Sequence, residues 1–279
     1  MSVVLRNGQV GDWRLSDDDF HTAFRLPTAR DKTEVLKERH PLARDCRISF
    51  EEESHTYTVD GVAVPLSVTG LIHRYSRGFD ATEAIRVMRP ETRQNYTDRG
   101  LVTESEITES WTRNGAVQSA RGTLMHFQIE QYINRCQIEE PWSPEFQQFV
   151  TLFNGISDQQ PFRTELSIFS SQYNIAGQID GLFKHLDGTF VVWDWKRCKH
   201  LRYDSHTPML EPLSHLPDTN YFHYALQLNL YRHVLETEYD MPVSGMYLGV
   251  FHPNRSEPLC VRIPAMDDEL RLILEERAQ

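Results

Sequence analysis

Stretches of β-branched and aromatic residues recur along the chain, and several of them alternate with polar residues. This composition fits a pleated, half-buried surface and predicts β-strands. The predicted strands cover residues 47–50, 55–59, 163–169, 173–184, 189–196, 245–252 and 259–263. The three central strands follow one another through short turns, so we expect them to pair antiparallel.

Apolar residues spaced three and four apart predict helices between these strands. The expected helices cover residues 32–38, 70–75, 119–136, 146–153 and 220–235, and a last one starts near residue 266. The pattern is strongest over residues 119–136. Residues 80–140 are mostly helical in pattern, with breaks expected near Pro90 and Gly115, and 203–219 form a polar insertion without a regular pattern.

The order of these elements predicts the fold class. Helices come first, then three antiparallel strands, a helix and two more strands, which is typical of an α/β chain whose mixed central β-sheet is flanked by helices. A length of 279 residues suits one large domain. We therefore expect an N-terminal extension at 1–45 and a single domain at 46–279 that carries a helical insertion at 80–140.

The second and third central strands can be aligned residue by residue through the turn that joins them. A three-residue loop, Leu186–Gly188, with its glycine in the left-handed conformation places His185 opposite Thr189. Counting back then sets Asp180 directly opposite Asp194. Two facing carboxylates repel each other unless a cation lies between them. A two-residue loop would instead put Asp180 on the other face, so the register is a test of this interpretation.

Lys196 lies two residues after Asp194 on the third strand. Their side chains therefore point to one face of the sheet, and Trp193 and Trp195 point to the other. Carboxylates hold hard cations such as Mg²⁺ or Mn²⁺, and a nearby ammonium can position a water or offset phosphate charge. These are the groups that metal-assisted phosphodiester hydrolysis needs, although acid-x-Lys tripeptides also occur on solvated strand faces.

Three further sets of polar residues could belong to the same site. His126 and Glu130 lie four residues apart on the strongest predicted helix and therefore share a face. The imidazole could bind a metal ion, and the carboxylate could orient the imidazole. The alternative is an exposed pair of residues on the helix surface. Gln227 and Tyr231 repeat this spacing and could contact phosphate oxygens or support a lysine, or be half-buried helix residues. Glu165 could reach the metal site or face solvent.

Charge limits the partners that this chain can bind. A net charge of −11 argues against wide nonspecific coating of a nucleic-acid duplex, but not against a narrow groove. Basic residues are concentrated after the third central strand, and arginines recur between residues 74 and 99, where a solvated helix face is the alternative. The candidates for nucleic-acid binding are Arg121, Arg197, Lys199 and Arg202.

No apolar run is long enough to span a bilayer. The N-terminal residues lack the apolar core of a signal peptide, and the acidic Asp17–Asp19 argues against a transit peptide. We therefore expect an intracellular protein in the cytoplasm or nucleus, without membrane partners. The cysteines are widely spaced and form no C-x-x-C pair, so we expect reduced thiols in or near the core. They are Cys46, Cys136, Cys198 and Cys260.

Motifs of this kind follow one another in a fixed order along the chain. They are Gly122-x3-His126-x3-Glu130, Glu165, Gly177-x2-Asp180, Asp194-x-Lys196 and Gln227-x3-Tyr231. In this order they resemble the PD-(D/E)XK nuclease superfamily, and more narrowly its RecB-type, lambda-exonuclease-like branch. That branch includes the mitochondrial genome maintenance exonuclease and related viral or phage exonucleases. The resemblance covers residues 47–263 and implies a restriction-endonuclease-like core that cleaves nucleic acid with Mg²⁺ or Mn²⁺.

The resemblance also implies roles for individual residues. The metal ligands would be His126, Asp180, Asp194 and the backbone carbonyl of Trp195. Lys196 would orient or deprotonate the attacking water. The remaining site residues would be Gln227 and Tyr231 near the phosphate, with Glu130 and Glu165 in support.

The function implied is hydrolysis of DNA, as an exonuclease or end-processing enzyme on single strands or ends. The alternatives are an RNA endonuclease with the same histidine-containing site and a non-catalytic module that binds nucleic acid or a partner.

The chain departs from the superfamily pattern at some positions. Ile179 stands where the superfamily usually has proline, and such a replacement is common in this branch. The cysteine set that holds an iron–sulfur cluster in several relatives is absent, so no cluster is expected. Any helicase would be a separate chain. Aromatic residues near the site could stack bases or pack in the core: Trp195, Tyr203, Tyr221 and Tyr224.

Overall fold

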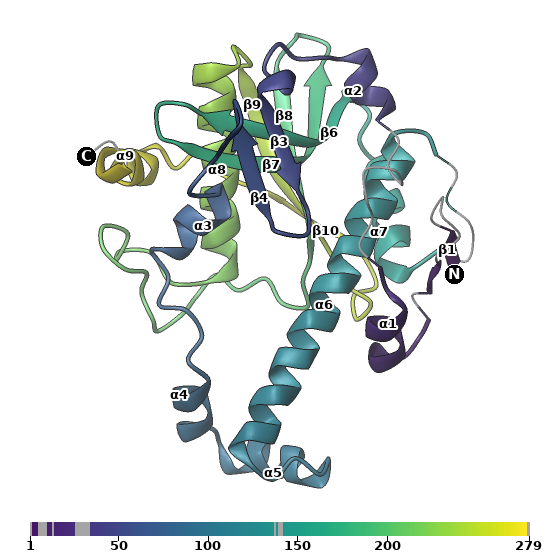
Figure 1. The fold of residues 1–279 in the computed structure, drawn as a ribbon, viewed down its shortest axis with the longest axis vertical. Coiled ribbons are helices and arrows are strands. Elements are labelled where there is room, and N and C mark those ends of the chain that lie inside the picture. The colour runs from purple at the N-terminus through teal and green to yellow at the C-terminus, as the bar shows by residue number, and fades with distance from the viewer. Residues whose placement is uncertain are drawn as a thin grey trace.

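The computed structural model of the chain describes residues 2–4, 10–12, 14–25, 34–136, 138 and 142–277 (Figure 1). The helices are α1 (Asp17–Ala23), α2 (Val35–Arg39), α3 (Val68–His73), α4 (Ala81–Arg86), α5 (Pro90–Asp98), α6 (Glu104–Ile133), α7 (Pro144–Asn154), α8 (Asn220–Glu238) and α9 (Asp267–Arg277), with a 3-10 turn at Asp45–Arg47. The strands are β1 (Ser2–Val4), β2 (Val10–Asp12), β3 (Ile48–Glu51), β4 (Thr56–Val59), β5 (Val62–Ala63), β6 (Gln159–Ser170), β7 (Ile175–His185), β8 (Phe190–Arg197), β9 (Val243–Phe251) and β10 (Leu259–Arg262).

Five of these strands form the central sheet in the order β10-β9-β8-β7-β6. Strands β8 and β9 run parallel, and the other neighbours in this sheet run antiparallel. A parallel pair needs a crossover connection, and α8 supplies it between β8 and β9. The predicted α/β class, a mixed central sheet flanked by helices, is confirmed (Figure 1).

The hairpin between β7 and β8 has the predicted three-residue loop. The His185 N–H donates to the Thr189 carbonyl over 2.9 Å, and Gly188 has a φ of +91°, the left-handed conformation that favours glycine. Residue pairs continue in the same register from Lys184 with Phe190 to Gly181 with Trp193. The next pair in this register is Asp180 with Asp194, as the loop count predicts.

Helices cover both faces of the central sheet (Figure 1). On one face α3, α8 and α9 share a core with Val192 and Leu248 of β8 and β9. On the other face α6 and α7 pack against Trp193 and Trp195. Because side chains alternate along β8, Asp194 projects toward the α8 side. It thus lies on the face opposite Trp193 and Trp195, as the sequence predicts.

A second, three-stranded sheet, β3-β4-β5, lies beside the ends of β6 and β7. Strands β3 and β4 pair antiparallel with Ile48 opposite Val59, as expected for residues 47–59. Tyr57 of β4 packs against Phe169 and Ala176. This contact fixes the small sheet next to the strands that carry the acidic residues.

Helix α6 is one continuous helix, so the break expected near Gly115 is wrong. A capping box between Thr103 and Glu106 starts the helix, and a single glycine inside a helix costs only about 1 kcal/mol relative to alanine, which does not end it. Its last residue is Ile133 rather than the predicted Cys136. The break expected near Pro90 is confirmed, because α4 ends at Arg86 and α5 begins at Pro90. Residues 79–115, here called the arm, extend away from the body (Figure 1).

The described N-terminal residues pack on the body. Phe20 of α1 contacts Leu124 and Phe127 of α6, and Leu36 of α2 joins the core beside α6 and α7. The first two residues of the helix expected at 32–38 lie outside the described residues. Among the helices that the structure describes, none combines the length and apolar character needed to cross a membrane.

The cysteines are unpaired thiols, but their burial differs from the prediction. Cys46 and Cys260 are exposed, and Cys136 and Cys198 are half-buried. Cys46 lies in the 3-10 turn and Cys260 on the edge strand β10, where one face of the chain meets solvent.

Candidate metal centre

Three acidic residues lie at matching positions on three neighbouring strands. The pairs Thr164 with Gly181 and Leu166 with Ile179 bracket Glu165 of β6 and set it level with Asp180 of β7. The β7–β8 register sets Asp180 level with Asp194 in turn. The sheet therefore places Glu165, Asp180 and Asp194 in one row.

His126 approaches this row from α6. Its Nδ1 lies 3.6 Å from Oε1 of Glu165 and 3.7 Å from Oδ1 of Asp180. One ligand atom from each of these three residues can be chosen so that all lie within 4.8 Å of one another. Two carboxylate oxygens and an imidazole nitrogen at this spacing are a donor set that a divalent cation can share.

The charges of the row act on His126. Burial alone would lower the pKa of the imidazole, but Asp180 and then Glu165 outweigh it and raise the pKa to about 9. Without a cation the ring is therefore protonated near neutral pH. A metal ion would take the place of that proton, because imidazole binds metals only in its neutral form.

Glu165 reaches the row through an unusual backbone conformation. Its φ is +45°, the left-handed region that residues with a Cβ rarely adopt. Its carbonyl oxygen accepts a hydrogen bond from the Gln178 side chain over 3.2 Å. Strand β7 is irregular next to Glu165. Ile179 and Gly181 are two residues apart and would share a face in a regular strand. Ile179 instead packs toward α8, whereas a Cβ at Gly181 would meet Trp193 and Trp195 on the opposite face. The regular alternation is thus interrupted at the site.

Asp194 is almost fully buried, with 1% of its surface exposed. Its Oδ1 accepts a hydrogen bond from Lys196 Nζ over 2.9 Å, and its Oδ2 has no hydrogen-bond partner among the described residues. Burial raises its pKa to about 6, against the Lys196 ammonium and helped by the Asp180 charge. A buried carboxylate oxygen without a donor is costly unless water or a cation satisfies it, so this atom fits a metal ion.

Asp180 is also tied to the third strand. Its Oδ2 accepts the Trp195 N–H over 2.7 Å. This bond anchors the backbone next to the Trp195 carbonyl, a predicted metal ligand. Burial raises the pKa of Asp180, against His126 and Lys196, which lower it. The compact three-residue group contains Glu165, expected only in support, and Asp194 stands beside it.

Lys196 points into the same site. Its Nζ lies 5.0 Å from the centre of the Tyr224 ring of α8. Burial lowers the pKa of the Lys196 ammonium, but Asp194 and Asp180 outweigh this and raise it. The structure thus holds a half-buried cation beside the acidic row, within reach of an anionic group.

Gln227 and Tyr231 lie one turn apart on α8, and both are buried. Gln227 Nε2 donates a hydrogen bond to the Tyr231 hydroxyl over 2.8 Å. Burial raises the pKa of Tyr231 well above its usual value, and the charges of Asp194 and Asp180 add to this. The phenol is therefore neutral and close enough to feel the acidic row. Gly177 makes room for it, since a Cβ there would lie 2.7 Å from Tyr231 Cε1.

Tyr57 of β4 is a neighbour of the site that sequence reasoning gave no role. Burial raises its pKa, and the nearby charges of Glu165 and Asp180 raise it further. Its hydroxyl is thus a neutral donor beside the row. The strand predicted over residues 55–59 contains Tyr57, but only the packing of β4 against Phe169 and Ala176 brings that strand beside the row.

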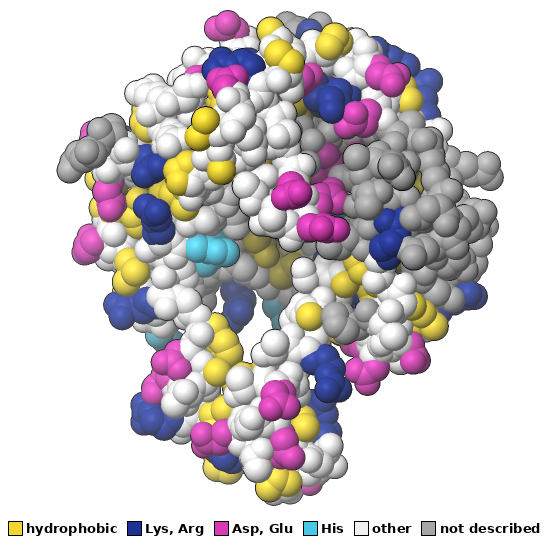
Figure 2. Space-filling model, in the orientation of Figure 1, with side chains coloured by type: hydrophobic (Ala, Val, Ile, Leu, Met, Phe, Trp, Pro, Cys, Tyr) yellow, Lys and Arg dark blue, Asp and Glu magenta, His cyan; other side chains and the backbone are white. Residues whose placement is uncertain are grey.

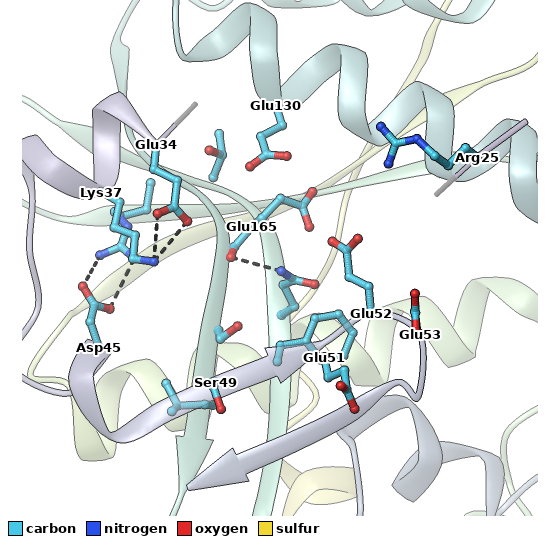
Figure 3. A pocket seen from close by; sticks show the side chains of 16 residues that line it. Arg25, Glu34, Lys37, Asp45, Ser49, Glu51, Glu52, Glu53, Glu130 and Glu165 are labelled. Carbon is cyan, nitrogen blue, oxygen red and sulfur yellow. Dashed lines mark hydrogen bonds and ion pairs between the residues drawn. The ribbon is translucent and has the colours of Figure 1, made fainter. Parts of the chain in front are cut away.

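Glu130 of α6, predicted as a supporting residue, is buried. It lines a cavity of about 760 Å³ together with Glu165, and their carboxyl groups face each other in it (Figure 3). We call this the acidic cavity, because seven acids and only three bases line it. The acids are Glu34, Asp45, Glu51, Glu52, Glu53, Glu130 and Glu165, and the bases are Arg25, Lys37 and Arg163.

The candidate nucleic-acid contacts are spread over different environments. Arg197 is half-buried and pairs with Glu145 over 2.6 Å, and it also hydrogen-bonds Gln118. Arg121 pairs with Asp17 over 2.9 Å and lies over the Phe20 ring of α1. Both line a cavity of about 610 Å³ between α6, the start of α7 and the ends of β8 and β9, here called the α6–α7 cavity.

Lys199 lines the α6–α7 cavity as well, whereas Arg202 is exposed and lies outside it. Two of the four candidate cations, Arg121 and Arg197, are thus held in ion pairs with Asp17 and Glu145. Of the aromatic candidates, Trp195 is 1% exposed and belongs to the core, and Tyr203 is 45% exposed and packs on Tyr221.

Comparison with known proteins gives no family for this chain. No family model matches it, and no curated protein does. Two solved structures overlap with it at a TM-score of 0.30. One is SSO0001, at 16% identity over 75% of this chain and 82% of that one. The other is a candidate exonuclease from Eubacterium rectale, at 11% identity over 74% of this chain and 66% of that one.

Proposed function

We propose that this chain is a Mg²⁺- or Mn²⁺-dependent nuclease that hydrolyses DNA phosphodiester bonds at strand ends or on single strands. The observation that carries the proposal is the row of Glu165, Asp180 and Asp194 with His126 against it and Lys196 beside it. A scaffold gains nothing from a buried acid whose Oδ2 lacks a donor among the described residues.

The donor set fits a hard divalent cation. His126, Glu165 and Asp180 would hold it, and the unpaired Oδ2 of Asp194 offers a further oxygen from the next strand. Oxygen ligands with one imidazole suit Mg²⁺ and Mn²⁺ better than a thiolate-preferring metal. Such a cation, when bound, lowers the pKa of a water and offsets charge on a phosphodiester.

The protein groups supply position and charge. Lys196 donates a hydrogen bond to Asp194, and its ammonium lies over the Tyr224 ring. In this position it can contact an anionic phosphate or a water. Tyr231 is held by Gln227 and by the space at Gly177, so the hydroxyl stays fixed as a neutral hydrogen-bonding group. Trp195 binds Asp180 through its N–H, which fixes the carboxylate in the row. Preorganised groups of this kind stabilise charge that develops on phosphorus-bound oxygens.

An end-label assay tests the proposal. Single- and double-stranded DNA and RNA, labelled at either end, are incubated with Mg²⁺, Mn²⁺ or a chelator, and product lengths are followed over time. We expect metal-dependent shortening of DNA from one end. Preferred internal cleavage of RNA would support the RNA endonuclease instead, and no cleavage of any substrate with either metal would overturn the catalytic proposal.

Asp180→Asn separates the metal site from the fold. The asparagine Oδ1 can still accept the Trp195 N–H, so we expect the metal-free variant to unfold near the wild-type temperature. Mn²⁺ should stabilise the wild type by about 2.7 kcal/mol at a concentration of about 100 times its Kd, and this gain should vanish in the variant together with cleavage. Scanning calorimetry and the end-label assay measure both.

The control for this experiment is Asp158→Asn, an exposed aspartate in the loop before β6, which should behave as the wild type. Lys196→Ala should abolish cleavage while leaving Mn²⁺ binding detectable. An Asp180→Asn protein that still cleaves, or that still gains stability from Mn²⁺, would remove Asp180 from the site.

A further inference from the structure

The arm carries an open cleft of about 530 Å³ between α4, α5 and α6. Three aromatic residues line it, Phe79, Tyr96 and Trp111. The Trp111 Nε1–H donates to the Tyr96 hydroxyl over 2.7 Å, which fixes the indole. Phe79 packs edge-on against Trp111, with ring centres 5.4 Å apart, and is 73% exposed. We call this the arm cleft.

Exposed apolar surface continues around Phe79. Val87 also lines the arm cleft and is 58% exposed. Large apolar side chains gathered around a concave surface usually mark a binding site. A fixed indole next to an exposed phenyl ring presents flat faces of a size that suits a planar, aromatic ligand.

The charge of the arm cleft indicates what kind of planar ligand fits it. Arg89 is its one charged lining residue, and no carboxylate lines it. Among the described residues Arg89 takes part in no ion pair, whereas Arg86 and Arg93 of the arm pair with Glu83 and Glu104. A guanidinium beside aromatic rings suits a planar group with an attached anion, which describes a nucleotide.

Helix α6 connects the arm cleft to the metal centre. Trp111 and His126 lie on the same helix, about 22 Å apart at 1.5 Å per residue. At 100° per residue, Gly115, Ser119 and Gly122 lie within about 40° of His126 around the helix axis. A Cβ at Gly115 or Gly122 would have nothing within 4 Å, and Figure 2 shows the space between the arm and the body hollowed out. An extended strand therefore has an open path of several nucleotides between the two places.

We propose that the arm cleft holds an unpaired base of a single-stranded nucleic acid whose phosphodiester lies at the metal centre. The base stacks on the exposed ring of Phe79, which Trp111 supports edge-on, and Arg89 binds a neighbouring phosphate. This proposal rests on the proposed nuclease function and adds the substrate class to it. It makes a single strand several nucleotides long the preferred substrate, because a paired base cannot present its face to an aromatic side chain.

The test measures binding without cleavage. A short labelled oligothymidylate is titrated in chelator against the wild type, Phe79→Ala and Arg89→Gln, with fluorescence anisotropy as the readout. Stacking of one base on an aromatic ring is worth enough to change affinity about fivefold or more. We expect Phe79→Ala and Arg89→Gln each to weaken binding by at least about fivefold. Val102→Ala, an equally exposed apolar change on the same arm outside the cleft, should bind as the wild type.

Cleavage of two substrates distinguishes this proposal from the nuclease proposal. With Mn²⁺, a dinucleotide that reaches only the metal centre should be cut equally by the wild type and Phe79→Ala, whereas a longer strand should be cut more slowly by Phe79→Ala. Equal rates and affinities on the longer strand would overturn the arm-cleft proposal and leave the nuclease proposal standing. Absence of all cleavage in the wild type would overturn the nuclease proposal.

Two other occupants of the arm cleft are outcomes of the same experiment. If Phe79→Ala leaves oligothymidylate binding unchanged but converts a dimer into a monomer in sedimentation, the arm cleft binds a second copy of the chain. If it changes only capture of an apolar peptide, the arm cleft is a protein-docking site. Either result overturns the assignment to a nucleotide base.

Discussion

At the scale of single residues, the site depends on the ion pair between the half-buried Lys196 and the buried Asp194. Breaking a buried ion pair leaves an uncompensated charge and is strongly destabilising, so each of the two holds the other in the site. Asp194 still has a second oxygen without a partner among the described residues. Lys196 thus satisfies Oδ1 of Asp194, and a bound cation would satisfy Oδ2.

Gly177→Ala tests the packing that fixes Tyr231. The new Cβ would lie 2.7 Å from Tyr231 Cε1 and 3.1 Å from Val68 Cγ2, and the Tyr231 ring is 2% exposed. Overpacking of this kind costs about 1–3 kcal/mol, so we expect the free energy of unfolding to fall by that amount in urea denaturation. Cleavage should fall as well, because the hydroxyl that Gln227 binds is displaced.

Gly115→Ala is the matched control, since its Cβ would have nothing within 4 Å and alanine favours a helix. It should raise the stability slightly. Wild-type stability in Gly177→Ala would mean that Tyr231 moves aside at no cost, and that Gly177 does not position it.

The sequence predicts part of this site because local rules fix it. The turn chemistry at Gly188 sets the hairpin register, and the register brings Asp180 level with Asp194. The role of Glu165 could not be found this way, because its left-handed φ has no signature in a glutamate side chain. The ion pair of Arg197 could not be found either, since its partner Glu145 lies 52 residues away in the chain and only the packing of α7 brings it near.

At the scale of elements, α6 is the part that connects the most distant features. Its C-terminal half carries His126 and Glu130 and packs on the sheet through Met125, Ile129 and Ile133. Its N-terminal half forms one wall of the arm cleft. The amphipathic pattern predicts the C-terminal half, because that half is buried against the sheet. The N-terminal half buries only Ile107 and Val117, so the glycine at 115 suggested a break there. A single glycine costs too little to end a helix, and α6 runs on from its capping box at Thr103.

Gly122 allows the open face of α6 to be tested. Glycine inside a helix costs about 0.8–1.0 kcal/mol relative to alanine, and a Cβ at Gly122 meets nothing within 4 Å. Gly122→Ala and Gly122→Leu should therefore both raise the melting temperature. If a strand runs along this face toward His126, the leucine variant should cleave long single strands at least several times more slowly, while the alanine variant keeps the wild-type rate.

Steady-state kinetics on a dinucleotide and on a longer strand measure the difference for these variants. Gly122→Ala and Gly122→Leu should cut the dinucleotide at equal rates, because the dinucleotide reaches the metal centre without crossing Gly122. A leucine variant that is stabilised and cuts the longer strand at the wild-type rate would show that the strand does not follow α6.

At the scale of the whole molecule, the net charge of −11 is unevenly placed. The acidic cavity beside the metal centre has seven acids and three bases among its lining residues, and Figure 2 shows acidic side chains clustered on this face of the body. The α6–α7 cavity has two acids and three bases, and the arm cleft has one arginine and no acid. A polyanion is therefore repelled from one side of the metal centre and accepted on the others. The average composition of the chain hides this, because it reports only the sum.

Neutralising the acidic cavity should make the protein bind nucleic acid more tightly. Glu51 and Glu53 are exposed at its rim (Figure 3), and a unit charge at roughly 10 Å in water is worth about 0.4 kcal/mol, or about twofold in affinity. We expect Glu51→Gln with Glu53→Gln to raise the affinity for a labelled single strand about fourfold at low salt. Salt screens such charges over about 8 Å at physiological ionic strength, so the gain should disappear as salt rises.

The control is the double variant Asp268→Asn with Glu275→Gln on α9. It changes the net charge equally, and neither residue lines the acidic cavity. An equal gain in that control would show that the net charge of the chain, and not the position of these carboxylates, governs how a strand approaches the metal centre.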